Sequence, residues 1–316
     1  MIYSVWVPLL MPLLVAPVAR RMAGLLAPRQ AVRLLTAAAL TLGCCSAGAL
    51  GLLAAAGLLR LPPVAALGRL IHPVAGDGPV TAGAAVAAGA ALAVCVTALV
   101  RTVVRQRAEL RGARLEIGDG GELAVVRDAA PDAYALPGRP GRIVVTTGML
   151  RALAPAEREA LFAHERAHLA GRHHLFVAAA ELAAVCHPAL RGLRAPLGYA
   201  LERCADEAAA GAVGDRSLAA RAIGHAALAA HRAPTARPSV ALAATAGPVP
   251  RRVAALLEHR SAGAAGRGWH GRAVSGVAAA LLVCLSLSAG GAIDAATDLH
   301  GGIEAAQAGA GHHTGH

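Results

Sequence analysis

The sequence predicts a mostly α, multi-pass membrane protein with four transmembrane helices and a cytoplasmic α+β domain that carries a small β-sheet. Two observations lead to this fold class: four long apolar spans without charge, and an uneven distribution of arginine around them. Each span reaches the roughly 18–20 residues that a helix needs to cross hydrocarbon. The spans cover about 2–19, 34–59, 80–100 and 273–293.

These spans divide the chain into regions. Residues 1–103 hold the first three spans, and a cytoplasmic domain follows at 104–260. A Gly-rich linker at 261–272 then leads to the fourth span, and the extracytoplasmic tail 294–316 is expected to be disordered. The first span contains three prolines and has its arginines after it rather than before it. We therefore interpret it as a retained span, with a signal peptide as the alternative.

Arginine placement predicts the orientation. All thirty basic residues are arginine, and they gather after the first span, after the third span and before the fourth. The loop between spans two and three holds only Arg60 and Arg69, and no arginine follows span four. By the positive-inside rule both termini lie outside the cell membrane, and residues 101–272 are cytoplasmic.

The net charge of +11 has a physical role in this interpretation. Arginines on the cytoplasmic side are attracted to the anionic headgroups of the lipid bilayer, so topology accounts for the charge. The chain lacks a basic recognition helix and has few aromatic residues for base stacking. We therefore expect the bilayer, and no nucleic acid, as a partner.

The segment His164-Glu165-Arg166-Ala167-His168 lies in a predicted helix over Ala156–Gly171. Residues four apart on a helix differ by about 40° around its axis, so His164 and His168 share one face. Two imidazoles one turn apart can take two corners of a zinc tetrahedron. H-E-x-x-H is the pattern of zinc peptidases, in which the glutamate, here Glu165, acts as general base on a water.

A catalytic zinc needs a third protein ligand and keeps one position for water. A second predicted helix, from about Ala195 to Ala212, carries Glu202 and Asp206 on one face, which suits Glu202 as the third ligand. Asp206 then orients a ligand histidine through its other ring nitrogen. Asp206 or Glu207 in place of Glu202 is an alternative, whereas Cys204 lies about 200° around the helix from Glu202 and points away.

On these motifs the chain resembles the membrane-anchored gluzincin zinc metallopeptidases. That group includes the heat-shock membrane proteases, the CAAX prenyl proteases and the BlaR/MecR-type sensor peptidases. The blocks 133–138 and 142–150 resemble the strand and turn before the catalytic helix of the group. The segment 187–190, with the motif that follows it, is most similar to the BlaR/MecR branch, and the resemblance covers roughly residues 105–260.

The resemblance implies a zincin-like (gluzincin) peptidase domain with one Zn²⁺ per chain. Carried over to this sequence, it assigns His164, His168 and Glu202 as metal ligands, Glu165 as the base and Asp206 as the orienting residue. The segment 294–316 is too short for a folded sensor, so we expect no C-terminal sensor domain of the BlaR/MecR kind.

Some relatives carry a His-Pro pair before an arginine that contacts substrate or the transition state. Here the pair reads Gly247-Pro248, and Arg252 is the candidate for that contact. A basic residue near the membrane surface is the competing interpretation of Arg252. His225 and His231 are candidates for stabilising the oxyanion, although neither stands in a motif.

The remaining histidines fit other roles better. His173 and His174 follow the zinc helix too closely to act as third ligands. A disordered end explains the tail histidines better than a metal site does; these are His300, His312, His313 and His316.

The apolar segment His174–Cys186 is too short to span hydrocarbon and is expected to be a buried or interface-lying helix between the two zinc helices. This places the active site close to the bilayer surface. Alternation and β-branched residues predict strands at Glu122–Asp128 and Arg142–Thr146. Zinc peptidases commonly bind extended substrate along an edge strand, and either of these strands is a candidate.

The sequence thus predicts a zinc-dependent metalloendopeptidase of the membrane, which cleaves protein or peptide substrates at the cytoplasmic face with metal-activated water. The alternative is a signal-transducing membrane regulator that cleaves a transcriptional repressor. The residues do not specify an oligomeric state.

Overall fold

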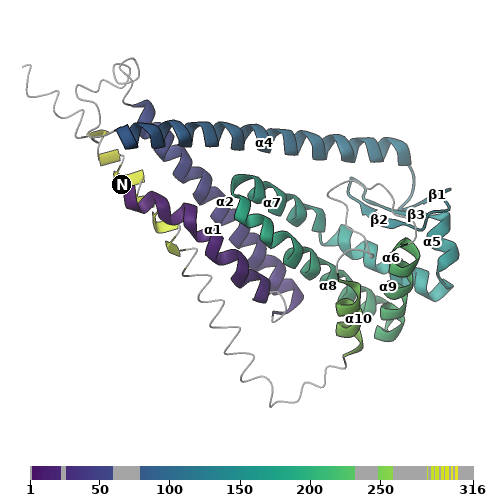
Figure 1. The fold of residues 1–316 in the computed structure, drawn as a ribbon. Coiled ribbons are helices and arrows are strands. Elements are labelled where there is room, and N and C mark those ends of the chain that lie inside the picture. Colours follow the sequence, from purple (N-terminus) through teal and green to yellow (C-terminus); the bar gives the residue numbers. More distant parts are fainter. Residues whose placement is uncertain are drawn as a thin grey trace, which may run out of the picture.

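The computed structural model describes residues 2–22, 26–59, 79–231 and 248–258, with scattered helical residues between 283 and 304. The described chain is mostly helical and contains a small three-stranded sheet, as the sequence predicted. In Figure 1 the long helix α4 (Pro79–Ile117) runs from the N-terminal helices at one end to the sheet at the other.

Within the described residues, two helices are long and apolar enough to cross a membrane: α2 (Pro28–Leu58) and the part Gly83–Ile117 of α4. They correspond to the second and third predicted spans. The first predicted span forms α1 (Ile2–Met22), but its apolar stretch Trp6–Ala19 falls short of the length required. The fourth span lies mostly outside the described residues. The structure therefore supports two of the predicted transmembrane helices, not four.

The joining helix α7 (His173–Cys186) packs against α2 and α4. Its approach to α2 is close because Gly43 has no side chain; a Cβ there would lie 3.3 Å from the Cα of Ala183. The 3-10 helix η1 (Pro188–Leu193) then turns the chain back into α8 (Arg194–Val213). Leu190 and Leu193 are fully buried among α1 and α2 side chains. The predicted short helix between the two zinc helices is present, and it is buried on one face only: His173, Ala180, Ala183 and Ala184 are buried, whereas Leu175 is exposed.

The sheet has the order β1-β3-β2, from β1 (Leu123–Val126), β2 (Ala133–Leu136) and β3 (Arg142–Thr146). Strand β3 is parallel to β1 and antiparallel to β2. Because β3 pairs on both sides, it offers no free edge. The prediction that Arg142–Thr146 is a candidate substrate-binding edge is therefore wrong, and β1 and β2 are the edges.

Local hydrogen bonds place the helices after the sheet. Thr146 ends β3 and caps α5 (Thr147–Ala152), because its Oγ1 accepts a hydrogen bond from the Met149 amide at 3.2 Å. Helix α6 (Pro155–Ala170) starts on a proline, and the Glu157 carboxylate accepts from the Ala154 amide at 3.0 Å. Helix α6 packs against β2, α8 and α9 (Arg216–His231), and α10 (Val249–Leu257) covers α8 and α9.

Candidate metal centre

Helix α6 brings its two motif histidines onto one buried face. The Nε2 atoms of His164 and His168 lie 3.0 Å apart, and the two side chains are 0% and 2% exposed. Glu165, between them in sequence, is also fully buried. The predicted helix and the predicted shared face are therefore both present.

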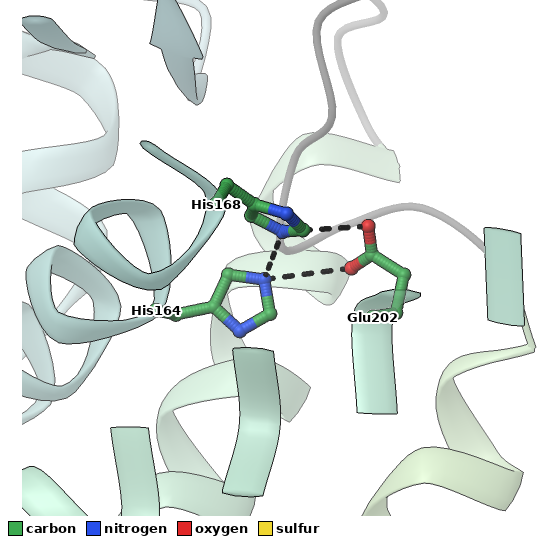
Figure 2. A group of neighbouring side chains, drawn as sticks. All are labelled: His164, His168 and Glu202. Carbon is green, nitrogen blue, oxygen red and sulfur yellow. Dashed lines mark hydrogen bonds and ion pairs between the residues drawn. The ribbon is translucent and has the colours of Figure 1, made fainter. Parts of the chain in front are cut away.

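Glu202 reaches these histidines from α8, as Figure 2 shows. Its Oε2 lies 3.4 Å from Nε2 of His164, and its Oε1 lies 3.6 Å from Nε2 of His168. One ligand atom from each of the three residues falls within 4.8 Å of the others. Within the described residues, this is the group of histidine, cysteine and carboxylate side chains that could hold a metal ion.

The alternatives for the third position lie elsewhere. Cys204 is part-buried against the apolar core around α1 and α2. Glu207 forms a bidentate pair with Arg216 at 2.6 and 3.0 Å, on the outer side of α8. Asp206 contacts Nδ1 of His164, whereas Glu202 contacts Nε2 on the other side of the ring, so Asp206 is not placed as the third ligand.

Asp206 and Arg252 form a support behind His164. The Oδ1 of Asp206 lies 3.1 Å from Nδ1 of His164. Arg252, from α10, binds Asp206 with two hydrogen bonds of 2.8 and 2.6 Å, and its Nη1 lies 2.9 Å from Oε2 of Glu202. Arg252 is fully buried. Its guanidinium therefore engages the carboxylates behind the histidines, rather than lying at the membrane surface.

His168 has a different support, which sequence reasoning missed. Its Nδ1 lies 2.7 Å from Nδ1 of His173, the first residue of α7. The His173 ring folds over Gly171, where a Cβ would lie 2.4 Å from His173 Nε2. Sequence reasoning considered His173 only as a metal ligand. The sequence feature that could have indicated this contact is Gly171, two residues before His173, because only a residue without a side chain leaves room for the His173 ring to fold back over it.

Charge is distributed unevenly over the cluster. Burial lowers the pKa of His164, but the hydrogen bond to Asp206 and the neighbouring Glu202 outweigh burial and raise that pKa to about 9. Burial raises the pKa of Asp206, yet hydrogen bonds from Arg252 and His164 bring it below its ordinary value. The pKa of His168 is lowered, first by burial and then by nearby positive charge. The carboxylates thus favour positive charge at His164.

The other predicted histidines are not part of this group. His225, on α9, contacts the N-terminal end of α6, where its Nδ1 lies 2.7 Å from Oε1 of Glu157. His231 is exposed at the end of α9. His300 lies 3.2 Å from Glu304, and the remaining tail histidines lie outside the described residues.

A helix with H-E-x-x-H, completed by a glutamate from a second buried helix, defines a site of the zincin type of metallopeptidase. Residues 97–190 match the family model of peptidase family M48, which supports zinc metallopeptidase activity in general. The matched segment includes His164, Glu165 and His168 and ends before Glu202. No curated protein and no solved structure was found to match the chain.

Proposed function

We propose that this protein is a zinc-dependent metalloendopeptidase of the cell membrane that cleaves protein or peptide substrates at the cytoplasmic face. His164, His168 and Glu202 are the proposed ligands of one Zn²⁺. Zinc bonds of 2.0–2.2 Å to nitrogen and oxygen in a tetrahedron separate the ligand atoms by roughly 3.3–3.6 Å. Here Nε2 of His164 lies 3.0 Å from Nε2 of His168 and 3.4 Å from Oε2 of Glu202, while the other carboxylate oxygen, Oε1, lies 3.6 Å from Nε2 of His168. The convergence of these three buried side chains, with one ligand atom from each within 4.8 Å of the others, is the observation that carries the proposal.

The donor set also fits zinc chemically. Two histidines and one glutamate are a known catalytic zinc set. Among the described residues, the buried Oε1 of Glu202 has no hydrogen-bond donor. A buried carboxylate oxygen left in that state costs about 1–3 kcal/mol or more, which a bound cation would offset.

The mechanism assigns one task to each residue. Bound zinc would act as a Lewis acid toward water and the scissile carbonyl. Glu165 takes a proton from the attacking water and passes it to the leaving amine. Asp206 and His173 fix the orientation of the two imidazoles through their Nδ1 atoms. Arg252 offsets the charge of Asp206 and Glu202, so we assign it a positioning role rather than a substrate contact.

The proposed location rests on α2 and α4. Both are long and apolar enough to span a bilayer, and α4 continues beyond its apolar part as an arginine-rich helix that reaches the sheet. The positive-inside rule then puts the metal centre on the cytoplasmic side. Strand β2, the edge strand that packs against α6, is the proposed place for an extended substrate to pair.

Glu165→Gln tests the proposal, because the amide keeps the shape of the side chain but cannot act as a base. We expect about one bound zinc per chain, and loss of peptide cleavage by about 10²–10⁴-fold. Zinc content and cleavage are measured on the same detergent-purified sample. Glu159→Gln, an exposed change on the same helix, is the matched control. Cleavage that persists in Glu165→Gln removes Glu165 from the mechanism, and wild-type protein without zinc removes the function.

A further inference from the structure

A cavity of about 570 Å³ lies at the C-terminal end of α6, where three parts of the chain meet. Its walls come from the end of α4, the turn between β2 and β3, and the corner between α6 and α7. Leu110, Leu169 and Leu175 supply apolar surface, and Arg114, Arg139 and Arg172 supply charge. The metal ligands do not line it, so it is distinct from the cluster itself.

The lining of the cavity carries net positive charge, although Asp119 lines an adjoining hollow that also includes Arg114 and Arg139. No aspartate or glutamate lines the cavity itself. Arg114 donates from Nε to the Pro137 carbonyl at 2.9 Å, which fixes its guanidinium at the wall without neutralising its charge. Arg139 and Arg172 are exposed and, within the described part of the chain, form no ion pair. Arg114 and Arg172 also lower the pKa of His174 in the wall, after the larger effect of burial.

The position of the cavity connects it to the proposed substrate path. Leu169 directly follows the proposed ligand His168, and Arg172 lies at the end of the same turn. Strand β2 runs toward the cavity, because Pro137 follows its last residue and lines the wall. An extended peptide advances about 3.3 Å per residue, so a peptide paired along the four residues of β2 would run toward Pro137 and the arginines of the cavity wall.

We propose that this cavity is a substrate subsite that binds an acidic side chain, aspartate or glutamate, a few residues from the cleaved bond. This inference rests on the proposed peptidase function. Charge-assisted hydrogen bonds from guanidinium to carboxylate supply the selectivity. The apolar leucines cover the methylene part of the side chain, and the volume leaves room for the neighbouring backbone.

The experiment compares paired fluorogenic peptides that differ only in Glu or Gln at one position, with that position moved stepwise along the peptide. At one position we expect wild type to favour the acidic peptide by about 10-fold in kcat/KM, a ratio that shrinks as salt rises. In the double variant Arg139→Gln/Arg172→Gln, the ratio should fall to about one. Arg151→Gln, an exposed arginine on α5 away from the cavity, should keep the wild-type ratio.

Binding to the Glu165→Gln variant separates this inference from the proposed function. Fluorescence anisotropy with the same peptide pairs should show the same preference without turnover. Wild type that cleaves both peptides equally at every position overturns the subsite and leaves the peptidase standing. Wild type that cleaves no peptide overturns both. If the double variant loses activity on both peptides alike, and only in anionic bilayers, the cavity binds lipid headgroups and the subsite is overturned.

Discussion

His164 and His168 lie one turn apart on the same helix, yet the chain supports them by different chemistry. Behind His164 stands Asp206, a charged acceptor that Arg252 holds with two hydrogen bonds. Behind His168 stands His173, an imidazole held over a glycine. One support comes from distant segments and is charged, while the other is local. We therefore expect loss of the local support to cost less free energy than loss of the charged, distant support.

The energetic reason is charge, since both supports are buried but only the one behind His164 is ionic. Removal of one member of a buried charged group leaves the others unpaired in a medium that solvates them poorly, at a cost of about 3–5 kcal/mol. Loss of an imidazole acceptor leaves only one ring N–H without its partner, at about 1–3 kcal/mol. Substitutions in the two supports test this difference.

Arg252→Met should have the largest effect. It removes the cation between two fully buried carboxylates, Glu202 and Asp206, so the free energy of unfolding should fall by about 3–5 kcal/mol. Thermal or denaturant unfolding in detergent measures this. Arg251→Met is the control, since Arg251 is exposed and packs on Tyr199 at 4.9 Å, a contact of about 0.5–1 kcal/mol. Equal losses in the two variants would contradict the charged support.

Asp206→Ala should weaken zinc binding by about 10–100-fold, because His164 loses the acceptor that orients its ring. Competition with a chelator of known affinity measures the dissociation constant. Asp206→Asn keeps an acceptor oxygen but loses the charge, so it should fall between wild type and Asp206→Ala. An Asn variant as weak as the Ala variant would show that charge, not orientation, matters.

His173→Ala should weaken zinc binding by about 10-fold, the lower end of the range for such supports. His173→Gln is the rescue variant, because its amide oxygen can accept from the Nδ1–H of His168. Chelator competition should place the Gln variant near wild type while the Ala variant remains weak. A loss as large as that of Asp206→Ala would abolish the difference between the two supports.

Gly171→Ala should reproduce the His173 effect indirectly. A Cβ at Gly171 would lie 2.4 Å from His173 Nε2, so the ring must move off His168. Zinc affinity should fall by about as much as in His173→Ala. In the double variant Gly171→Ala/His173→Ala the losses should not add, because the ring is already gone. Additive losses would mean that the glycine acts through its other neighbour, the Ala167 carbonyl.

Arg216→Met should have the smallest effect. Arg216 pairs with Glu207 and donates from Nε to the Leu256 carbonyl at 2.9 Å, so it ties α10, and with it Arg252, to α8. The part-exposed pair contributes up to about 1 kcal/mol.

The Arg216 hydrogen bond lowers the pKa of Glu207 below 4.5, so its stabilisation is present above that pH and is lost as pH falls through the folded-state pKa. The stability difference between wild type and variant should therefore shrink in acid. Unfolding curves across that range measure it, and a pH-independent difference would show that the carbonyl contact, rather than the ion pair, carries the effect.

The sequence predicted what depends on local periodicity. The spacing of four residues put His164 with His168, and Glu202 with Asp206, on shared faces of helices that the structure contains. The strand Arg142–Thr146 was predicted with its observed bounds. Its central position in the sheet was not predicted, because the pairing partners of a strand are set by tertiary contacts. The same limit applies to Arg252, whose partners lie on another helix.

His173 was missed for a different reason. His173 lies five residues after His168, too close in sequence to act as the third metal ligand. The turn at Gly171 and Arg172 ends α6 and starts α7, and it directs the His173 ring back toward His168. Arg172 has a left-handed backbone with φ of 49°, which periodicity does not predict. Helical periodicity predicts which side chains share a face only within one helix. Beyond the end of the helix, the geometry of the turn decides which side chains meet.

The order of translation gives the buried arginine one more consequence. A ribosome adds Arg252 fifty residues after Glu202, so a nascent chain holds both histidines and both acidic residues before it holds their counter-charge. Until α10 packs against α8, Glu202 and Asp206 lack the guanidinium that pairs with both of them in the folded protein. The metal centre therefore gains its full set of buried charges only after α10 has been synthesised.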